Sequence, residues 1–323
     1  MLRRKGVALI VLCVAVSLAF TAAVFGQAKY TLDKKLVVGF VQMDNSQPWR
    51  TAETDSFKNE AANYNIDLKY VDAQDSQANQ IKALRSFIAQ KVDAIIFPPK
   101  VETGWEPVLR EAKAARIPVI LVDRGITVSD QSLYVSLLAS DFVFEGQQAA
   151  KWLAKAVNGT ANIVELQGTA GSSPAIDRKK GFGDVIKGYP GMKIIKSQDG
   201  NFEIGKGKQL MEAFLKAEGK NINAVYAHND GMALGAIQAI QEAGLKPGKD
   251  IIIVSVDGIK EAFQAMIDGN MNCTVECTPL LGGPAYDALR RYLAGEKLPR
   301  WIVSKDQTFP AEVAANVIDS RKY

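Results

Sequence analysis

Histidine and cysteine are scarce in this chain of 323 residues, which contains one histidine and three cysteines. With His228 as its sole imidazole and no Gly-x-Ser-x-Gly motif, the sequence offers no residue set for nucleophilic hydrolysis. Cys273 and Cys277 lie four residues apart in a segment that reads as a strand, and four strand residues span about 13 Å, too far for a disulfide. We expect Cys273 and Cys277 to be small buried thiols. For the protein as a whole, we expect no enzymatic activity and no bound cofactor or metal.

A large excess of charge is also absent. The formal net charge is +4, and without Arg3, Arg4 and Lys5 it would be +1 (4 − 3, because that segment holds no acid). A nearly neutral chain lacks the basic surface that phosphate backbones require, so we expect no nucleic acid partner.

Long hydrophobic runs are missing everywhere except at the start. Basic residues at positions 3–5 precede an apolar run from Gly6 to Phe20, which is typical of a secretion signal. A membrane anchor is the alternative, but small residues near Gly26 and Ala28 suit a signal peptidase. We therefore expect residues 1–28 to be a cleaved signal peptide and the mature protein to reach the periplasm. We also expect this protein to be a monomer.

The rest of the chain alternates short apolar strands with amphipathic helices, which predicts an α/β fold with parallel sheets. The pattern occurs twice, and in both halves the third strand runs into an acid, Asp123 or Asp257. A repeat of this length predicts two similar lobes. The expected strands are 36–41, 94–97 and 118–122 in the first half, and 162–166, 224–227 and 251–256 in the second.

Two helices have clear end signals. The segment 76–90 begins with Ser76 as a cap, and 230–243 begins with Asp230 as a cap and ends at Gly244, which can adopt a left-handed conformation. Residues 139–142 connect the halves without a stretch rich in proline or glycine. We expect a short hinge there.

Polar residues cluster after the expected strands, where open α/β sheets bind ligands. Such side chains suit a sugar, because carboxylates, amides and guanidinium groups bind neighbouring hydroxyls and an aromatic ring covers the apolar face. Each has a simpler alternative: the acids can cap turns, Trp49 can be a core residue, and Arg178 can lie on a solvated helix face. The residues are Asn45, Gln47, Trp49, Arg50, Asp123, Arg124, Arg178, Asn229, Asp230 and Asp257.

Several longer strings resemble the periplasmic sugar-binding proteins of the ribose and galactose type, from about Leu36 to about Leu298. They are WRTAET (49–54), TGWEPVLREA (103–112), AIDRKKGF (175–182) and YAHNDGMALGAIQAIQEAGLKPGKD (226–250).

The resemblance implies two Rossmann-like lobes joined by three crossings, near Ser140, Glu276 and Ser304. The first lobe would comprise 36–140 and 277–304, the second 141–276 and 305–323. It further implies a sugar bound in the cleft between the lobes and delivery to the permease of an ABC importer. A sugar sensor that presents its closed form to a chemoreceptor or a membrane kinase is the alternative.

The resemblance also assigns roles to individual residues. Trp49 matches a ring that stacks on the sugar, Phe202 matches a second aromatic, and Asp123 with Arg124 matches a ligand pair. Arg50 and Glu276 depart from the ribose type and favour a hexofuranose such as galactofuranose. The full set expected to bind ligand is Gln47, Trp49, Arg50, Glu53, Asp123, Arg124, Arg178, Phe202, Asn229, Asp257 and Glu276.

Two motifs imitate other functions. Residues 200–207 (GNFEIGKG) match the glycines and lysine of a phosphate-binding loop, but Gly207 stands where a magnesium-binding Ser or Thr belongs. Asp199, Asn201 and Glu203 suggest a calcium loop, but Ile204 stands in place of its glycine. We expect neither site to function.

Overall fold

The computed structural model describes residues 34–323. The expected signal peptide, 1–28, lies outside the described residues. Within the described range, no helix combines the length and apolar composition that crossing a bilayer requires.

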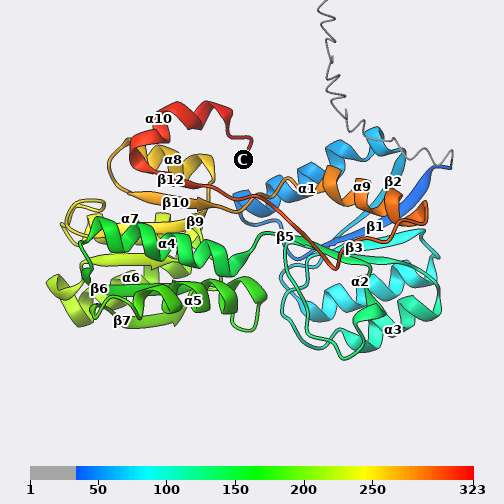
Figure 1. The fold of residues 1–323 in the computed structure, drawn as a ribbon, viewed down its shortest axis with the longest axis horizontal. Coiled ribbons are helices and arrows are strands. Elements are labelled where there is room, and N and C mark those ends of the chain that lie inside the picture. Colours follow the sequence, from blue (N-terminus) through cyan, green and yellow to red (C-terminus); the bar gives the residue numbers. More distant parts are fainter. Residues whose placement is uncertain (1–33) are drawn as a thin grey trace, which may run out of the picture. The chain divides into compact units, whose positions relative to one another are not determined.

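Residues 34–323 form two six-stranded sheets with corresponding strand orders, β11-β5-β4-β3-β1-β2 and β12-β10-β9-β8-β6-β7 (Figure 1). Each ladder is parallel except that between β10 and β12. The prediction of two similar α/β lobes is confirmed. The strands are β1 Leu36–Gln42, β2 Ile66–Asp72, β3 Ala94–Phe97, β4 Val119–Val122, β5 Ser136–Ala139 and β11 Trp301–Val303 in the first lobe, and β6 Thr160–Gln167, β7 Gly191–Asp199, β8 Ala224–Ala227, β9 Ile252–Asp257, β10 Cys273–Glu276 and β12 Thr308–Pro310 in the second.

Helices cover both faces of the first sheet. Successive side chains of a strand point to opposite faces, and in this sheet the side chains on both faces are apolar. Val38 and Phe40 pack with Tyr286, whereas Val41 packs in a separate cluster with Phe87. One layer therefore consists of α1 and α9, and the other of α2 and α3. The helices of this lobe are α1 Pro48–Glu60, α2 Gln77–Ala89, α3 Glu106–Ala114 and α9 Gly282–Leu293.

In the second lobe, pairs of helices pack closely through glycines. A Cβ on Gly146 of α4 would lie 2.2 Å from the carbonyl oxygen of Arg178 on α5. Gly207 of α6 serves the same purpose, since its Cβ would lie 2.6 Å from Met232 Cα on α7. The glycine of the apparent phosphate loop is therefore a helix-packing residue. The helices are α4 Phe142–Ala156, α5 Ser173–Ile186, α6 Ile204–Glu218, α7 Asp230–Glu242, α8 Lys260–Ile267 and α10 Ala314–Val317.

The chain passes between the lobes three times: from β5 to α4, from β10 to α9, and from β11 to β12. Two of these crossings are joined directly, because Ser140 Oγ donates to Asp306 Oδ1 at 3.1 Å. Three short connections, two of them joined by this hydrogen bond, suit a hinge about which the two lobes open and close.

The helix ends follow the local signals in part. Ser76 caps α2 by accepting from the backbone N–H of Asn79, and Gly244 after α7 has a φ of 74°. The prediction that Asp230 caps α7 is wrong. Asn229 is the cap and accepts from the N–H of Met232 at 3.0 Å, which frees the Asp230 carboxylate for more distant partners.

Candidate functional site

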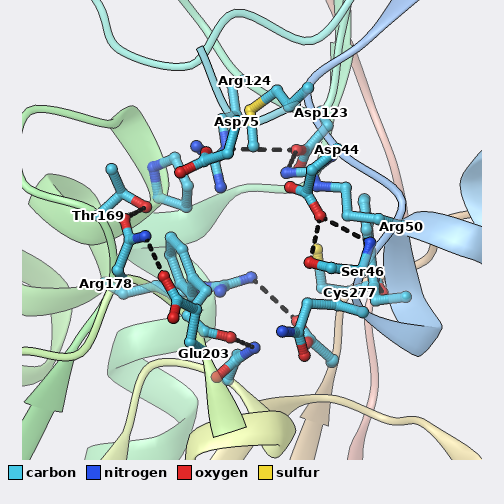
Figure 2. A pocket seen from close by; sticks show the side chains of 18 residues that line it. Asp44, Ser46, Arg50, Asp75, Asp123, Arg124, Thr169, Arg178, Glu203 and Cys277 are labelled. Carbon is cyan, nitrogen blue, oxygen red and sulfur yellow. Dashed lines mark hydrogen bonds and ion pairs between the residues drawn. The ribbon is translucent and has the colours of Figure 1, made fainter. Parts of the chain in front are cut away.

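A pocket opens between the two lobes, beyond the carboxyl ends of their strands (Figure 2). It contains about 100 Å³ of free space, and because one water needs about 10–15 Å³ on this measure, the pocket has room for one monosaccharide. Side chains from both lobes line it: Met43, Asp44, Ser46, Gln47, Trp49, Arg50, Asp75, Asp123, Arg124, Thr169, Pro174, Arg178, Asn201, Phe202, Glu203, Asn229, Asp257 and Cys277.

Asp123 and Asp257 occupy corresponding places at the ends of β4 and β9. Both have positive φ, 59° and 133° respectively, although neither is glycine. Strained backbone of this kind is concentrated at functional sites, where it directs a side chain. Both carboxylates line the pocket and are buried. Burial raises the pKa of Asp257 well above its usual range, against the lowering effect of Arg178.

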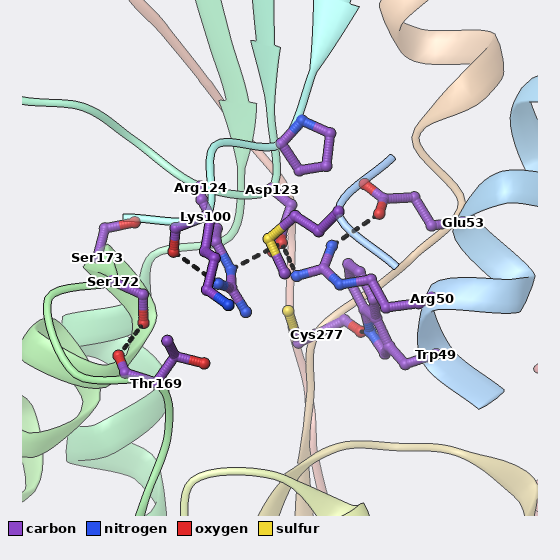
Figure 3. A network of polar contacts seen from close by, with 12 residues as sticks. Trp49, Arg50, Glu53, Lys100, Asp123, Arg124, Thr169, Ser172, Ser173 and Cys277 are labelled. Carbon is purple, nitrogen blue, oxygen red and sulfur yellow. Dashed lines mark hydrogen bonds and ion pairs between the residues drawn. The ribbon is translucent and has the colours of Figure 1, made fainter. Parts of the chain in front are cut away.

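Arg50 is held from two sides. Its Nη1 donates to Glu53 Oε2 at 2.7 Å and its Nη2 to Asp123 Oδ2 at 2.6 Å (Figure 3). Burial acts to lower the pKa of Arg50, but Asp123 and Glu53 together raise it, so the guanidinium stays charged. Burial also raises the pKa of Glu53, although Arg50 opposes this shift. The bridge from α1 to the end of β4 fixes the direction in which Arg50 faces the pocket.

Arg124 is less completely paired than Arg50. Its Nη1 donates to the carbonyl oxygen of Lys100 at 2.9 Å, and its Nε lies 3.5 Å from Asp123 Oδ2. That Nε is buried and has no hydrogen-bond partner within residues 34–323. Burial and the nearby Arg50 charge lower the pKa of Arg124 to about 10. An acceptor in the pocket would therefore relieve an unsatisfied buried donor.

Arg178 on α5 is the corresponding cation of the second lobe. Its Nε donates to Glu145 Oε2 at 2.7 Å and its Nη1 to the carbonyl oxygen of His228 at 2.6 Å. Its Nη2 lies 3.7 Å from Asp257 Oδ1. Burial acts to lower the pKa of Arg178, but Glu145, Cys277 and Asp257 together raise it well above its usual range.

His228 supports this arrangement from beneath the pocket. It is fully buried, its Nε2 lies 3.1 Å from Glu165 Oε1, and burial lowers its pKa. The backbone N–H of Gly168 donates to its Nδ1 at 3.3 Å. His228 does not line the pocket.

Two aromatic rings reach the pocket, one from each lobe. The Trp49 Nε1 donates to the carbonyl oxygen of Cys277 at 2.7 Å, and the guanidinium carbon of Arg50 lies 4.6 Å from the Trp49 ring centroid. Phe202 has a φ of 62°, and its ring packs directly against Gly168, in the space that a side chain at position 168 would fill. A Cβ on Gly168 would be 1.9 Å from Phe202 Cζ, so this glycine gives the ring its place.

Nine of the eleven residues expected to bind ligand line the pocket, and Glu53 and Glu276 do not. Glu53 is fully buried behind Arg50. Glu276 instead pairs with Arg321, whose Nη1 lies 2.6 Å from its Oε1. Asn45 is exposed and also lies outside the pocket lining. The residues inside are Gln47, Trp49, Arg50, Asp123, Arg124, Arg178, Phe202, Asn229 and Asp257.

Asp230 lies next to the pocket and has a structural role, because its carboxylate accepts four hydrogen bonds. Its Oδ2 accepts from the backbone N–H groups of Gly258 and Ile259 at 2.7 and 3.0 Å. Its Oδ1 accepts from the hydroxyls of Ser255 and Thr274. Burial raises its pKa to about 6, although the four hydrogen bonds oppose this shift. Asp230 thereby fixes the turn that presents Asp257.

The prediction from the sequence missed a further group of lining residues, most of which lie in loops that follow strands. Asp44 and Ser46 follow β1, Asp75 follows β2, and Asn201 with Glu203 follow β7. Neither β2 nor β7 was predicted, so nothing in the sequence placed the loops beyond them at a pocket. The residues after β7 suggested only an incomplete calcium loop, and Phe202 was indicated by the resemblance alone. Had these edge strands been recognised, the rule that ligands bind at the carboxyl ends of strands would have indicated both loops. The other missed residues are Met43, Thr169, Pro174 and Cys277.

Relatives of this chain are known from sequence and from structure. It is 50% identical to the galactofuranose-binding protein YtfQ of Escherichia coli strain K12, over 94% of this chain and 97% of that protein. It is 54% identical, with a TM-score of 0.87, to the periplasmic binding protein component of the arabinose ABC transporter from Shewanella sp. ANA-3, bound to α- and β-L-arabinofuranose. That match covers 88% of this chain and 95% of the solved one.

A structure from Mycobacterium smegmatis in complex with β-D-fucofuranose is 46% identical, with a TM-score of 0.86, over 89% of this chain and 95% of that one. The model of the periplasmic binding protein domain matches residues 38–297. With its two corresponding α/β lobes and the pocket between them, the chain belongs to the periplasmic binding protein family.

Proposed function

We propose that this protein is the extracytoplasmic receptor of an ABC sugar importer, which captures a monosaccharide between its lobes and delivers it to the permease. One observation carries the proposal: Arg50, Arg124 and Arg178 are buried around one small pocket, together with Asp123 and Asp257. Buried charges are costly unless they are paired and hydrogen-bonded. A ligand rich in hydroxyls supplies both donors and acceptors to such groups.

We infer that the sugar is a furanose, with galactofuranose or a related hexofuranose as the favoured ligand. The relatives named above bind galactofuranose, arabinofuranose and fucofuranose. A five-membered ring with its exocyclic carbons offers several hydroxyls around a small apolar centre. The charged groups would bind these hydroxyls, and Trp49 and Phe202 would contact the apolar centre.

The nine expected residues that line the pocket are the proposed ligand contacts. Arg124 Nε, which has no hydrogen-bond partner within residues 34–323, would donate to a ring or hydroxyl oxygen. The Asp257 carboxylate, whose Oδ1 lies 3.7 Å from Arg178 Nη2, would accept from a hydroxyl of the sugar. Glu53 and Glu276 contribute indirectly, because they hold Arg50 and Arg321.

The remaining expectations complete this proposal. The protein would be exported with the help of residues 1–28, act in the periplasm as a monomer and carry out no chemical reaction. It would bind no nucleic acid. Its partners would be the sugar and the permease of the importer.

Isothermal titration calorimetry tests the proposal with D-galactose, D-fucose, L-arabinose and D-ribose. We expect binding of one or more of the first three, whose furanose forms correspond to the ligands of the relatives. Binding of D-ribose alone would contradict the assignment. Native mass spectrometry of freshly purified protein provides an independent check, because a closed pocket retains its ligand.

Two variants locate the site. Arg124→Ala and Asp257→Ala each remove charge-assisted hydrogen bonds of about 1.5–3 kcal/mol, which corresponds to about a ten- to hundredfold loss of affinity. The matched control is Arg116→Ala, which removes an exposed arginine of the first lobe away from the pocket. Unaltered binding by both pocket variants would mean that the sugar binds elsewhere.

A further inference from the structure

Beside the pocket, two hydrogen bonds join the lobes directly. The backbone N–H of Glu102 donates to the carbonyl oxygen of Gly171 at 2.9 Å. The backbone N–H of Gly125 donates to Ser173 Oγ, also at 2.9 Å. Both donors belong to the first lobe and both acceptors to the second. None of these four residues lines the sugar pocket.

The two donors belong to loops that are connected to each other. The Thr127 N–H donates to the carbonyl oxygen of Glu102 at 2.8 Å, so the loop after β3 and the loop after β4 form one surface. On the opposite side, Gly171 and Ser173 lie at the start of α5, the helix that carries Arg178. Arg124 immediately precedes Gly125. The two bonds therefore join segments that also present ligand-binding groups. Figure 3 shows Ser173 and Arg124 on these two segments.

Ser173 is well placed for this contact. Its side chain is buried, and Ser172, not Ser173, occupies the cap position of α5. Ser172 Oγ donates to the carbonyl oxygen of Thr169 at 2.7 Å, within the second lobe. The two neighbouring serines thus have different roles, one within its lobe and the other between lobes.

We propose that the bonds Glu102–Gly171 and Gly125–Ser173 form an interlobe clasp that stabilises the closed cleft without touching the sugar, and that Ser173 thereby determines ligand affinity. The clasp rests on the proposed function only in that the affinity it determines is for a sugar. Opening the cleft breaks both bonds, so they contribute only to the closed form. A contribution confined to the closed form adds to the binding of every ligand that the closed form holds.

Charges at the same place oppose closure. Burial raises the pKa of Glu102, and the charge of Asp177 on α5 raises it further. Burial and then Asp141, the cap of α4, raise the pKa of Asp177, while Lys180 lowers it. Like charges brought together by closure favour the open form. The clasp therefore works against a local repulsion.

Stopped-flow tryptophan fluorescence with D-galactose and L-arabinose tests the clasp in Ser173→Ala. We expect the dissociation rate constant to rise about fivefold, which corresponds to one net hydrogen bond, with the association rate constant changed less than twofold. The rise should be equal for both sugars, because the lost bond does not involve the ligand. Ser129→Ala is the control, since its hydroxyl bonds Glu106 within the first lobe.

Two results would overturn the clasp. An unchanged dissociation rate constant would show that the Gly125–Ser173 bond does not stabilise the closed form. A rise that differs between the sugars would show that Ser173 acts through a ligand contact. Neither result would affect the proposed function, because wild-type binding is measured in the same experiment.

If the wild-type protein bound neither sugar, the proposed function would fail and the clasp would still be tested. Spin labels at the exposed positions Lys82 and Lys216, one on each lobe, report the interlobe distance of the ligand-free protein. We expect a smaller closed fraction in Ser173→Ala than in the wild type. Coincident distance distributions would then refute the clasp.

Discussion

Replacing Asp230 by alanine or by asparagine separates the roles of its hydrogen bonds and its charge. Alanine leaves the backbone N–H of Ile259 without an acceptor in a buried place, and it leaves the N–H of Gly258 with only its longer bond to Thr274 Oγ1 at 3.2 Å. One unsatisfied N–H costs about 1–3 kcal/mol, and the hydroxyls of Ser255 and Thr274 lose their acceptor as well, so Asp230→Ala should lower the free energy of unfolding by at least about 1–3 kcal/mol. It should also weaken sugar binding, because the released turn carries Asp257.

Asparagine, by contrast, can keep the whole arrangement. Its side-chain oxygen can accept from both N–H groups, and its amide can donate to the hydroxyls of Ser255 and Thr274, which rotate. Because burial already raises the pKa of Asp230 to about 6, its charge adds little stability. We expect Asp230→Asn to change the free energy of unfolding by less than about 1 kcal/mol.

Guanidinium chloride unfolding and calorimetric titration measure both variants. The control is Asp250→Asn, where an exposed loop carboxylate accepts from the N–H of Lys246 at 2.8 Å. We expect a change within about 0.5 kcal/mol there. If Asp230→Asn proved as destabilising as Asp230→Ala, the charge would be the stabilising feature, and the reasoning from hydrogen-bond geometry would be refuted.

Three further changes test other parts of the structure. Gly168→Ala should weaken sugar binding about tenfold without unfolding the protein, because a Cβ there would occupy the place of the Phe202 ring. Calorimetry measures the affinity, and an unchanged affinity would exclude a role for the ring. Burial raises the pKa of Asp306 to about 8. Because the folded protein holds the Asp306 proton more tightly than the unfolded chain, protonation of Asp306 stabilises the fold. This contribution is complete below a pH of about 4 and is lost as the pH rises through 8. The melting temperature should therefore fall less between pH 7 and pH 9 in Asp306→Asn than in the wild type, and parallel falls would contradict the assignment. Gly207→Ser, which would complete the apparent phosphate loop, should instead cost about 1–3 kcal/mol by crowding Met232, and ATP should not raise its melting temperature.

The sequence predicted the central strands well because they are buried on both faces and therefore read as apolar runs. The edge strands β2 and β7 lack this signal, since most of their residues are exposed or half-buried. The short strands β11 and β12 escaped detection in the same way. The loops following β2 and β7, with Asp75 and Asn201, were missed for this reason. The four-residue strand β5 was also missed, although it lies inside the sheet and is mostly buried.

Local patterns could not reveal partners that are distant in the sequence. Asp230 looks like a helix cap, and only the folded chain brings it to the N–H groups of Gly258 and Ile259. Glu276 similarly lies near the cleft, but Arg321, 45 residues later, takes its carboxylate. By contrast, Asp123 and Asp257 were predictable. Each follows or ends a buried parallel strand, and the carboxyl ends of these strands all lie at the edge of the sheet where ligands bind.

The return of the chain to the first lobe has a consequence for folding during the proposed export. The apolar face formed by Val38 and Phe40 is covered by Tyr286 and Leu289 of α9, and the sheet ends with β11, at residues 301–303. A chain that emerges from the translocation channel with its amino end first exposes this face until nearly all of its length has passed. The second lobe, whose strands β6 to β10 are consecutive, can assemble earlier. The first lobe to be translocated is therefore the last to be completed, and until then it is the part that periplasmic chaperones would have to protect from aggregation.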